Sequence, residues 1–279
     1  MSLFSEDVRI ALIGGGKMGE AIMGGWIASD QSPARALSAE NFVVANPGLP
    51  RREYLMQTYG VDCVAQAADI TEADIVVLAV KPQVMIGMLE TICDATQFAD
   101  CLFISIAAGM ATDRLQKALP VDARLVRVMP NTPLLVGAGA TTVCGSASAT
   151  EDDIELVRAL FTCLGEALVV DEGDMDATGA LSGSGPAYVA AMIEALTAAG
   201  VKEGLDAALA EELALQTVWG TVELIRKTGQ TPEQVRVAVC SPGGSTLAAL
   251  AAMDEAGLAS AYEAGVAAAV QRSKELGAC

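Results

Sequence analysis

The sequence predicts an α/β protein in which a doubly wound parallel sheet is followed by an all-helical region. Short apolar runs alternate with helical patterns up to about residue 171, whereas no strand-like run follows Glu172. The later part is rich in alanine at helical spacing, and a glycine-rich turn, residues 14–19, joins the first apolar run to the first helical pattern. We therefore expect an N-terminal Rossmann-type domain, residues 1–171, and an all-helical C-terminal domain, residues 172–279.

The expected strands are short runs of branched apolar residues, the pattern of strands buried on both faces of a parallel sheet. They comprise residues 8–13, 41–45, 74–80, 101–106 and 125–129, with two weaker candidates at 141–144 and 167–171. Besides the helix after the glycine turn, helical spacing predicts helices at residues 51–59, 151–164, 186–199, 207–227, 247–253 and 260–276.

Composition excludes several classes of protein. The chain of 279 residues has a formal net charge of −18, which argues against nucleic acid as a partner because phosphate binding needs clustered Lys and Arg. It is 52% hydrophobic, yet no apolar run approaches the roughly 18 residues of a membrane span. No basic segment followed by an apolar core marks a signal peptide, so we expect a cytoplasmic protein without membrane association.

Two residue types limit the chemistry. Seven cysteines without a C-x-x-C pair fit reduced thiols, and Cys240, although it adjoins a glycine-rich loop, is interpreted as a small buried side chain. The chain contains no histidine, which removes the commonest acid–base catalyst and the usual zinc ligand. We expect a metal-free site whose chemistry does not use imidazole.

The glycine-rich turn has the G-x-G-x-x-G pattern of a dinucleotide site. Gly14 permits a tight turn, Gly16 permits close approach of a pyrophosphate, and Gly19 permits close packing of helix on strand. The helix that follows presents free N–H groups and a partial positive charge to phosphates. A dinucleotide site is expected here, and a glycine turn without a ligand is the alternative.

The end of the second strand bears on the choice between NADPH and NADH. NAD-specific proteins carry an acidic residue there that binds the ribose 2′-hydroxyl, whereas this chain has Asn46. No carboxylate is placed to repel a 2′-phosphate, and Arg51 or Arg52 could reach one. This favours NADPH and leaves NADH open, since the two arginines could instead begin a solvated helix.

Three later strand ends converge on the same edge of the sheet, where the ribose and nicotinamide of a cofactor would lie. They are Lys81-Pro82, Ala107-Ala108-Gly109 and Asn131-Thr132-Pro133. Small residues there permit close approach of a flat ring, and Asn131 could form a hydrogen bond with a carboxamide. Each segment alone could be an ordinary turn.

Two loops in the helical region combine glycines with hydroxyl groups, at residues 181–188 and 240–246. Each opens a helix and offers backbone N–H groups and hydroxyls, which suits a carboxylate bound without arginine. Helix capping is the alternative, but it would explain only one Ser or Thr for each helix.

The last expected helix carries a stripe that must be buried. Tyr262, Val266, Ala269, Val270 and Ser273 recur at helical spacing, and a helical domain of about a hundred residues is marginal alone. We expect the stripe to pack against a second subunit, with packing on the chain's own first domain as the alternative.

Taken in order, these motifs resemble the pyrroline-5-carboxylate reductase family. The resemblance rests on the N-terminal glycine loop, on segments 79–82 and 128–133, and on the more specific motifs at 182–187 and 241–246. It covers nearly the whole chain. It implies an enzyme that reduces the cyclic imine 1-pyrroline-5-carboxylate to L-proline with NAD(P)H. It also implies that the helical domain forms a homodimer, with a decamer as a further assembly.

The resemblance implies roles for individual residues. Thr246 would be the catalytic residue, with its hydroxyl near the ring nitrogen. The substrate-binding residues expected are Ser182, Ser184, Ser241, Gly243, Gly244, Ser245 and Thr246. The cofactor-binding residues expected from the motifs and the resemblance are Ile13, Gly14, Gly15, Gly16, Lys17, Met18, Asn46, Arg51, Ala79, Val80, Lys81, Pro82, Ile106, Ala107, Ala108 and Asn131.

Several positions depart from the family pattern. Ser245 stands where Thr is common and keeps the hydroxyl, whereas Val237-Ala238 replaces polar residues. Pro47 stands where many bacterial members carry arginine, and Ala67 where a cofactor-binding asparagine is frequent. These changes leave the preference for NADPH to Arg51 or Arg52.

Two other functions stay open. A 3-hydroxyacid dehydrogenase needs a catalytic lysine in the second domain, and Lys202, Lys227 and Lys274 all lie away from the glycine-rich loops. A catalytically silent dinucleotide sensor would fit the missing cofactor contacts, but the intact 241–246 loop argues against it.

Overall fold

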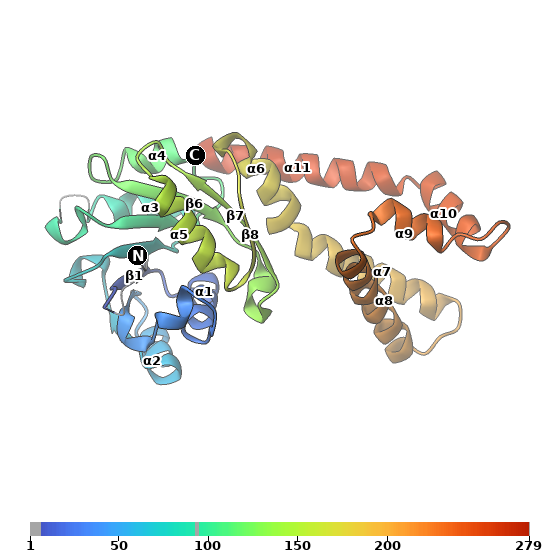
Figure 1. The fold of residues 1–279 in the computed structure, drawn as a ribbon, viewed down its shortest axis with the longest axis horizontal. Helices are drawn as coiled ribbons and strands as arrows, with labels where there is room; N and C mark the ends of the chain where they lie inside the picture. Colours follow the sequence, from blue (N-terminus) through green and yellow to red (C-terminus); the bar gives the residue numbers. More distant parts are fainter. Residues whose placement is uncertain (1–6, 93–94, 279) are drawn as a thin grey trace. The chain divides into compact units, whose positions relative to one another are not determined.

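The computed structural model describes residues 7–92 and 95–278 (Figure 1). Within them, eight strands form one sheet in the order β3-β2-β1-β4-β5-β6-β7-β8. The strands are Ile10–Ile13 (β1), Phe42–Ala45 (β2), Asp62–Val64 (β3), Ile75–Leu78 (β4), Leu102–Ser105 (β5), Arg124–Met129 (β6), Gly139–Gly145 (β7) and Gly165–Val169 (β8). The α-helices are Lys17–Ile27 (α1), Leu49–Tyr59 (α2), Pro82–Leu89 (α3), Thr112–Gln116 (α4), Glu151–Thr162 (α5), Met175–Thr178 (α6), Gly185–Lys202 (α7), Ala207–Thr228 (α8), Pro232–Ala238 (α9), Ser245–Glu255 (α10) and Leu258–Ala278 (α11).

The chain divides into two compact units, one of Met1–Ser184 with Ala269–Cys279 and one of Gly185–Ala268. The first holds the doubly wound sheet and the second is helical, so the predicted fold class is confirmed. Residues 172–184 belong to the first unit, where Met175 and Ala180 are buried. The domain boundary expected after residue 171 stays a prediction.

The sheet differs from the all-parallel expectation at one pair of strands. β7 pairs antiparallel with β6 and parallel with β8, while the other neighbours are parallel. The connection over residues 130–138 is shorter than the dozen or so residues that a parallel crossover needs, so the chain turns back instead. The sequence pattern did not predict β3, because a strand of three residues is too short to show a periodic pattern.

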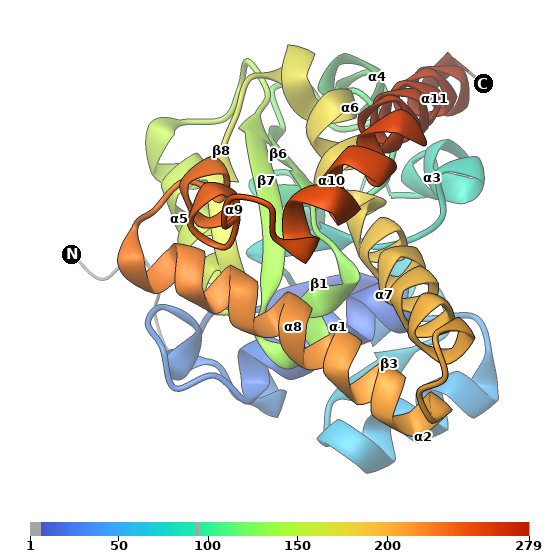
Figure 2. The ribbon, with the colours of Figure 1, turned by 90° about the vertical axis from the view of Figure 1, so that its right-hand side faces the viewer.

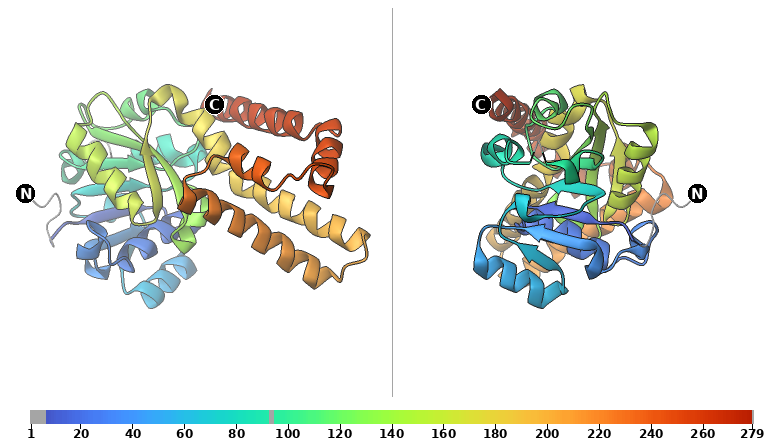
Figure 3. Two further views of the ribbon diagram at one scale, coloured as in Figure 1. Left: turned by 45° about the vertical axis from the view of Figure 1, so that its right-hand side comes forward. Right: turned by 90° about the vertical axis from the view of Figure 1, so that its left-hand side faces the viewer.

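Helices cover both faces of the sheet in the first unit (Figure 3). Successive residues of β1 point to opposite faces, so Ile10 packs in one core beside Trp26 of α1, whereas Ala11 packs in the other beside Met85 of α3. Trp26 is buried and donates its indole N–H to the carbonyl of Leu160 in α5 at 2.9 Å. Both cores are continuous with the strand ends that carry the expected site.

The helical unit has little core of its own. α7 and α8 lie side by side (Figure 2). Asp206 starts α8 by accepting a hydrogen bond from the Ala208 N–H at 3.0 Å. Within residues 185–268, all of which the structure describes, the buried apolar side chains are Ala210, Ala214 and Val235. Larger side chains of this unit stay exposed and form an apolar surface.

The end of α11 packs against the first unit near α4 (Figure 1). Arg114 donates to the carbonyl of Gly277 at 2.6 Å, and the Ser273 hydroxyl donates to Asp176 at 2.7 Å. The expectation that the whole stripe of this helix meets a second subunit is therefore wrong for Ser273. Its hydroxyl finds a carboxylate on the same chain, and a polar partner of this kind leaves no trace in a hydrophobic pattern.

No helix in the described ranges is both long enough and apolar enough to cross a bilayer.

Candidate active site

The glycine loop between β1 and α1 has a different steric demand at each glycine. Gly14 has φ +106°, and a Cβ there would lie 2.6 Å from the carbonyl oxygen of Ala79. A Cβ on Gly19 would lie 2.4 Å from the carbonyl oxygen of Gly14. Around Gly16 nothing lies within 4 Å of the Cβ position. The tight turn and the close helix packing are thus internal requirements, whereas the space at Gly16 is open to a ligand.

The N-terminus of α1 is likewise accessible to a ligand. Gly16 is its N-cap and has no side chain to satisfy the first N–H groups of the helix. Those groups and the helix dipole favour an anion. The residues present therefore fit the pyrophosphate of a dinucleotide.

The strand ends that the sequence singled out do meet at one edge of the sheet. β1, β4 and β5 are parallel neighbours, and the backbone continues their pairing past the strands. The Ala79 N–H donates to the Ile13 carbonyl at 2.8 Å, and the Ile106 N–H donates to the Leu78 carbonyl at 3.1 Å. Segment 79–82 therefore lies beside the glycine loop, and segment 106–109 lies one strand further along the same edge of the sheet.

Asn131 follows β6 but its side chain already serves the backbone. Its amide N–H donates to the Ser182 carbonyl at 3.0 Å, and its oxygen accepts from the Ala140 N–H at 2.9 Å. The residue is buried, at 7% exposure. A hydrogen bond to a carboxamide would have to use its second amide hydrogen, so this role stays a prediction.

The two arginines expected near a 2′-phosphate both lie by the loop. Arg52 donates to the carbonyls of Asn46 and Pro47, each at 2.8 Å. Arg51 donates through Nε to the Gly15 carbonyl at 2.5 Å and forms an ion pair with Glu20 of α1. Neither arginine merely begins a solvated helix.

Glu20 is a residue of this site that the sequence reasoning missed. Its carboxylate also accepts hydrogen bonds from the hydroxyls of Tyr54 and Tyr59, each at 3.0 Å. Burial raises the pKa of the carboxyl, but the hydrogen bonds from Arg51 and the tyrosines outweigh burial and hold the pKa below its ordinary 4.5. The available signal was an acidic residue in the first turn of a helix expected to bind phosphates.

A cavity of about 310 Å³ lies in the first unit beside the end of β5 and the end of α11. Its wall includes Ala108, Ser184 and the buried Arg127. Arg127 forms an ion pair with Glu172, whose carboxylate also accepts a long hydrogen bond from the Cys144 thiol at 3.6 Å. The sequence signal for Arg127 was a charge inside the apolar run of β6, which we did not use.

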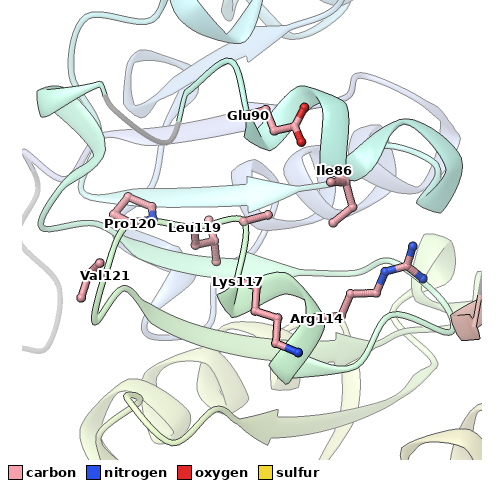
Figure 4. Close-up of a pocket in the computed structure, with 8 residues that line it drawn as sticks. Ile86, Glu90, Arg114, Lys117, Leu119, Pro120 and Val121 are labelled. Atoms are coloured by element: carbon pink, nitrogen blue, oxygen red, sulfur yellow. The ribbon is translucent and has the colours of Figure 1, made fainter.

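A second hollow in this unit contains none of the expected site residues. Ile86 of α3 and Glu90, the residue that follows α3, line it together with Arg114 of α4 and residues 117–121 (Figure 4). Arg114 is the residue that bonds the end of α11. This hollow is therefore next to the C-terminal packing rather than the glycine loop.

Ser182 lies in a π-helical turn, Gly179–Gly183, and Ser184 joins this turn to α7. The Ser182 hydroxyl donates to the Thr178 carbonyl at 2.8 Å, so it serves its own helix. Ser184 instead lines the cavity of about 310 Å³ beside the end of β5.

The loop at residues 241–246 belongs to the helical unit. Gly243 adopts φ +72°, and the Gly244 N–H donates to the Ser241 carbonyl at 2.9 Å, which turns the chain into α10. Gly244 is the N-cap of α10 and supplies no capping side chain, so none of the three hydroxyls of the loop serves as the cap. Ser245 and Thr246 occupy the first turn of the helix, as a carboxylate site would require.

The described residues contain no cluster of three or more Cys, Asp or Glu side chains that could hold a metal ion. Cys93 and Cys279 lie outside these residues.

Comparison with known proteins agrees with this architecture. A family model described as pyrroline-5-carboxylate reductase dimerisation matches residues 172–276, and one described as NADP oxidoreductase coenzyme F420-dependent matches residues 9–109. The pyrroline-5-carboxylate reductase of Synechocystis sp. is 42% identical over 97% of this chain and 99% of its own. That of Escherichia coli is 38% identical over 97% and 98%, respectively.

Two solved structures are also similar. Plasmodium falciparum pyrroline carboxylate reductase with NADP bound matches with a TM-score of 0.86 at 31% identity, over 98% of this chain and 100% of that one. Coxiella burnetii pyrroline-5-carboxylate reductase matches with 0.87 at 34%, over 97% and 98%. Fold and loop together define a dinucleotide-dependent oxidoreductase with a separate helical domain. The chain belongs to the pyrroline-5-carboxylate reductase family.

Proposed function

We propose that this chain reduces the cyclic imine 1-pyrroline-5-carboxylate to L-proline with NAD(P)H, the last step of proline synthesis. The main support is that a pyrroline-5-carboxylate reductase matches 97% of this chain. In addition, the space at Gly16 suits a dinucleotide. Family membership favours this function over a 3-hydroxyacid dehydrogenase. It also favours an active enzyme over a silent sensor, because the 241–246 loop is intact.

Different residues of this chain bind the cofactor and the substrate. A reduced nicotinamide supplies the hydride when it is bound. The N–H groups at the start of α1 hold the pyrophosphate, and the small side chains of Ala107 and Ala108 permit the ring to approach the backbone. Ser245 and Thr246 bind the substrate carboxylate, and the Thr246 hydroxyl holds the ring nitrogen.

No strong protein acid is needed in this scheme. An imine is basic enough to bind as an iminium ion, so the substrate brings the proton that its nitrogen keeps. This agrees with a chain that contains no histidine. Catalysis then comes mainly from positioning the imine carbon against the hydride donor.

The finer points are part of the same proposal. NADPH is the preferred cofactor, supported by Asn46 at the end of β2, by Arg51 on the glycine loop and by Arg52, which bonds the Asn46 carbonyl. The helical region, residues 172–279, is the dimerisation and substrate-binding domain, and the protein is a homodimer that can assemble further into a decamer. We expect a cytoplasmic protein without nucleic acid partners, in line with its free thiols and its charge of −18.

The test is the loss of nicotinamide absorbance when the purified protein meets pyrroline-5-carboxylate, with NADPH and NADH in parallel. We expect rapid oxidation of the cofactor with formation of proline. At low cofactor concentration, the rate with NADPH should exceed the rate with NADH. A protein that binds NADPH but oxidises it with no imine would refute the proposal.

A further inference from the structure

Glu20 is an unexpected residue at the N-terminus of a phosphate-binding helix. It lies in the first turn of α1, directly after the glycine loop. A carboxylate there repels an anionic cofactor unless a cation compensates its charge. Arg51 supplies that cation through an ion pair, which raises the question of what the pair contributes.

Arg51 is held along one side of its guanidinium group. Nε donates to the Gly15 carbonyl at 2.5 Å, and Nη2 donates to the Gly16 carbonyl at 3.4 Å and to Glu20. No described residue receives a hydrogen bond from Nη1, and the side chain is 30% exposed. The Nε and Nη2 edge of the guanidinium is therefore fixed on the glycine loop, whereas Nη1 is available to a ligand.

Glu20 is fixed in turn. The hydroxyls of Tyr54 and Tyr59 donate to its Oε1, while Oε2 pairs with Arg51. The ring of Tyr54 also lies under the guanidinium, with its centroid 5.0 Å from Cζ of Arg51. Charge-assisted hydrogen bonds are stronger than neutral ones, so these four side chains form one network that restrains the arginine.

The position of this network relates it to the ribose of a dinucleotide. In doubly wound folds, the 2′ position of the adenosine ribose lies between the glycine loop and the end of the second strand. Arg51 spans this interval, since it is on α2 after Asn46 and bonds Gly15 and Gly16. An arginine restrained before binding loses less freedom when it meets a phosphate.

We propose that Glu20 is a positioning residue for cofactor selectivity, which orients Arg51 so that the open edge of its guanidinium receives the 2′-phosphate of NADPH. The inference rests on the proposed function, because it concerns the cofactor of that reaction. NADH lacks this phosphate and gains nothing from the arrangement.

The test measures binding, so that it does not depend on turnover of the imine. Dissociation constants of NADP⁺ and NAD⁺ are determined by calorimetry for the full-length protein and for Glu20→Gln. The ratio of the NADP⁺ constant to the NAD⁺ constant should rise about fivefold, because a charge-assisted bond that restrains Arg51 is lost. Glu53→Gln removes an exposed carboxylate from α2 and should leave the ratio unchanged, which controls for net charge.

A double-mutant cycle tests whether Glu20 acts through Arg51. Arg51→Ala should raise the ratio by itself, and Glu20→Gln added to Arg51→Ala should change it no further. Tyr59→Phe removes one donor to Glu20 and should shift the ratio in the same direction by less, which preserves the test if Glu20→Gln does not fold.

Three results would overturn the inference: an unchanged ratio in both Glu20→Gln and Tyr59→Phe, a ratio that falls, or an equal shift when Arg51 is already alanine. Failure of the proposed function is distinguishable, because it would appear as a wild-type protein that binds both dinucleotides but reduces no imine.

Discussion

At the level of single residues, the glycine loop separates two reasons for a glycine that a motif cannot distinguish. Gly19 is required by the fold, since a Cβ would lie 2.4 Å from the Gly14 carbonyl oxygen. Gly16 has no protein atom within 4 Å of its Cβ position, so the fold does not require it. We expect a bound pyrophosphate to need the space that its small size leaves.

Gly16→Ala should therefore keep the stability of the protein and lose affinity for the cofactor. We expect a melting temperature within about 2 °C of wild type and a dissociation constant for NADPH raised at least about tenfold by the clash. Calorimetry and thermal denaturation measure the two quantities. Gly19→Ala is the matched variant and should lower the melting temperature. Unaltered NADPH binding in Gly16→Ala would contradict the placement of the pyrophosphate.

Thr246 is the residue whose loss should affect chemistry more than cofactor binding. Thr246→Ala removes the hydroxyl that is proposed to hold the ring nitrogen, and kcat should fall about 10- to 100-fold while the dissociation constant for NADPH stays the same. Thr246→Ser keeps the hydroxyl and should retain most of the activity. Steady-state kinetics on pyrroline-5-carboxylate decide the matter, and an unchanged kcat in Thr246→Ala removes Thr246 from the mechanism.

Two thiols should be chemically silent in the folded protein. Burial raises the pKa of Cys101 to about 12 and that of Cys144 to about 11, so both remain protonated at pH 8. Iodoacetamide should label the half-buried Cys163 and Cys240 before Cys101 and Cys144, as followed by mass spectrometry of the peptides. Denatured protein, in which all of these thiols react, is the control. Labelling of Cys101 as fast as Cys240 in the folded state would be inconsistent with this expectation.

At the level of elements, the sequence predicted what depends on local apolar pattern. Ile75–Leu78 is buried on both faces, and the buried strand predicted over residues 74–80 is confirmed there. The direction of β7 was not recognised, because strand polarity depends on the length of a connection rather than on side-chain pattern. The site followed the same division: the glycine loop is local in sequence, whereas the contact between Glu20 and Arg51 joins two helices and requires the fold.

The packing of α11 on the first unit is another long-range contact, and it depends on a pair of glycines. A Cβ on Gly277 would lie 2.3 Å from the carbonyl oxygen of Gly109, and Gly109 itself adopts φ +73°. Gly109 follows Ala107 and Ala108, which are expected to lie near the nicotinamide. The end of α11 therefore supports the loop that carries part of the expected cofactor site.

Gly277→Ala should weaken this support. Overpacking against backbone costs about 1–3 kcal/mol, and we expect a lower melting temperature together with a raised KM for NADPH. Gly87→Ala is the matched control, because Gly87 is an exposed helical glycine with nothing within 4 Å of its Cβ position, and it should be neutral or stabilising. Thermal denaturation and initial rates test both variants. A lower melting temperature with no change in KM would separate α11 from the cofactor loop.

At the level of the whole molecule, the two units bury their apolar surface in different ways. The first unit has two extensive cores, one on each face of its sheet. The helical unit buries only Ala210, Ala214 and Val235 among the described residues 185–268. Three small side chains cannot offset the conformational entropy of so many ordered residues. We therefore expect this unit to complete its core against another chain.

The exposed side chains on α8 identify a place where that core should form. Trp219 is 61% exposed and Leu213 is 51% exposed, and such large side chains contribute about 1.5–3 kcal/mol each when they are buried. We expect wild-type protein to be at least dimeric at micromolar concentration by light scattering.

Trp219→Lys should shift the protein toward monomer, lower its helix content and abolish activity, because the helical unit loses its core. Gln57→Lys adds the same charge at an exposed position of α2 in the first unit and should change none of these properties. A monomeric wild type with full helix content would mean that the helical unit is stable without a partner, and the physical case for the dimer would fail.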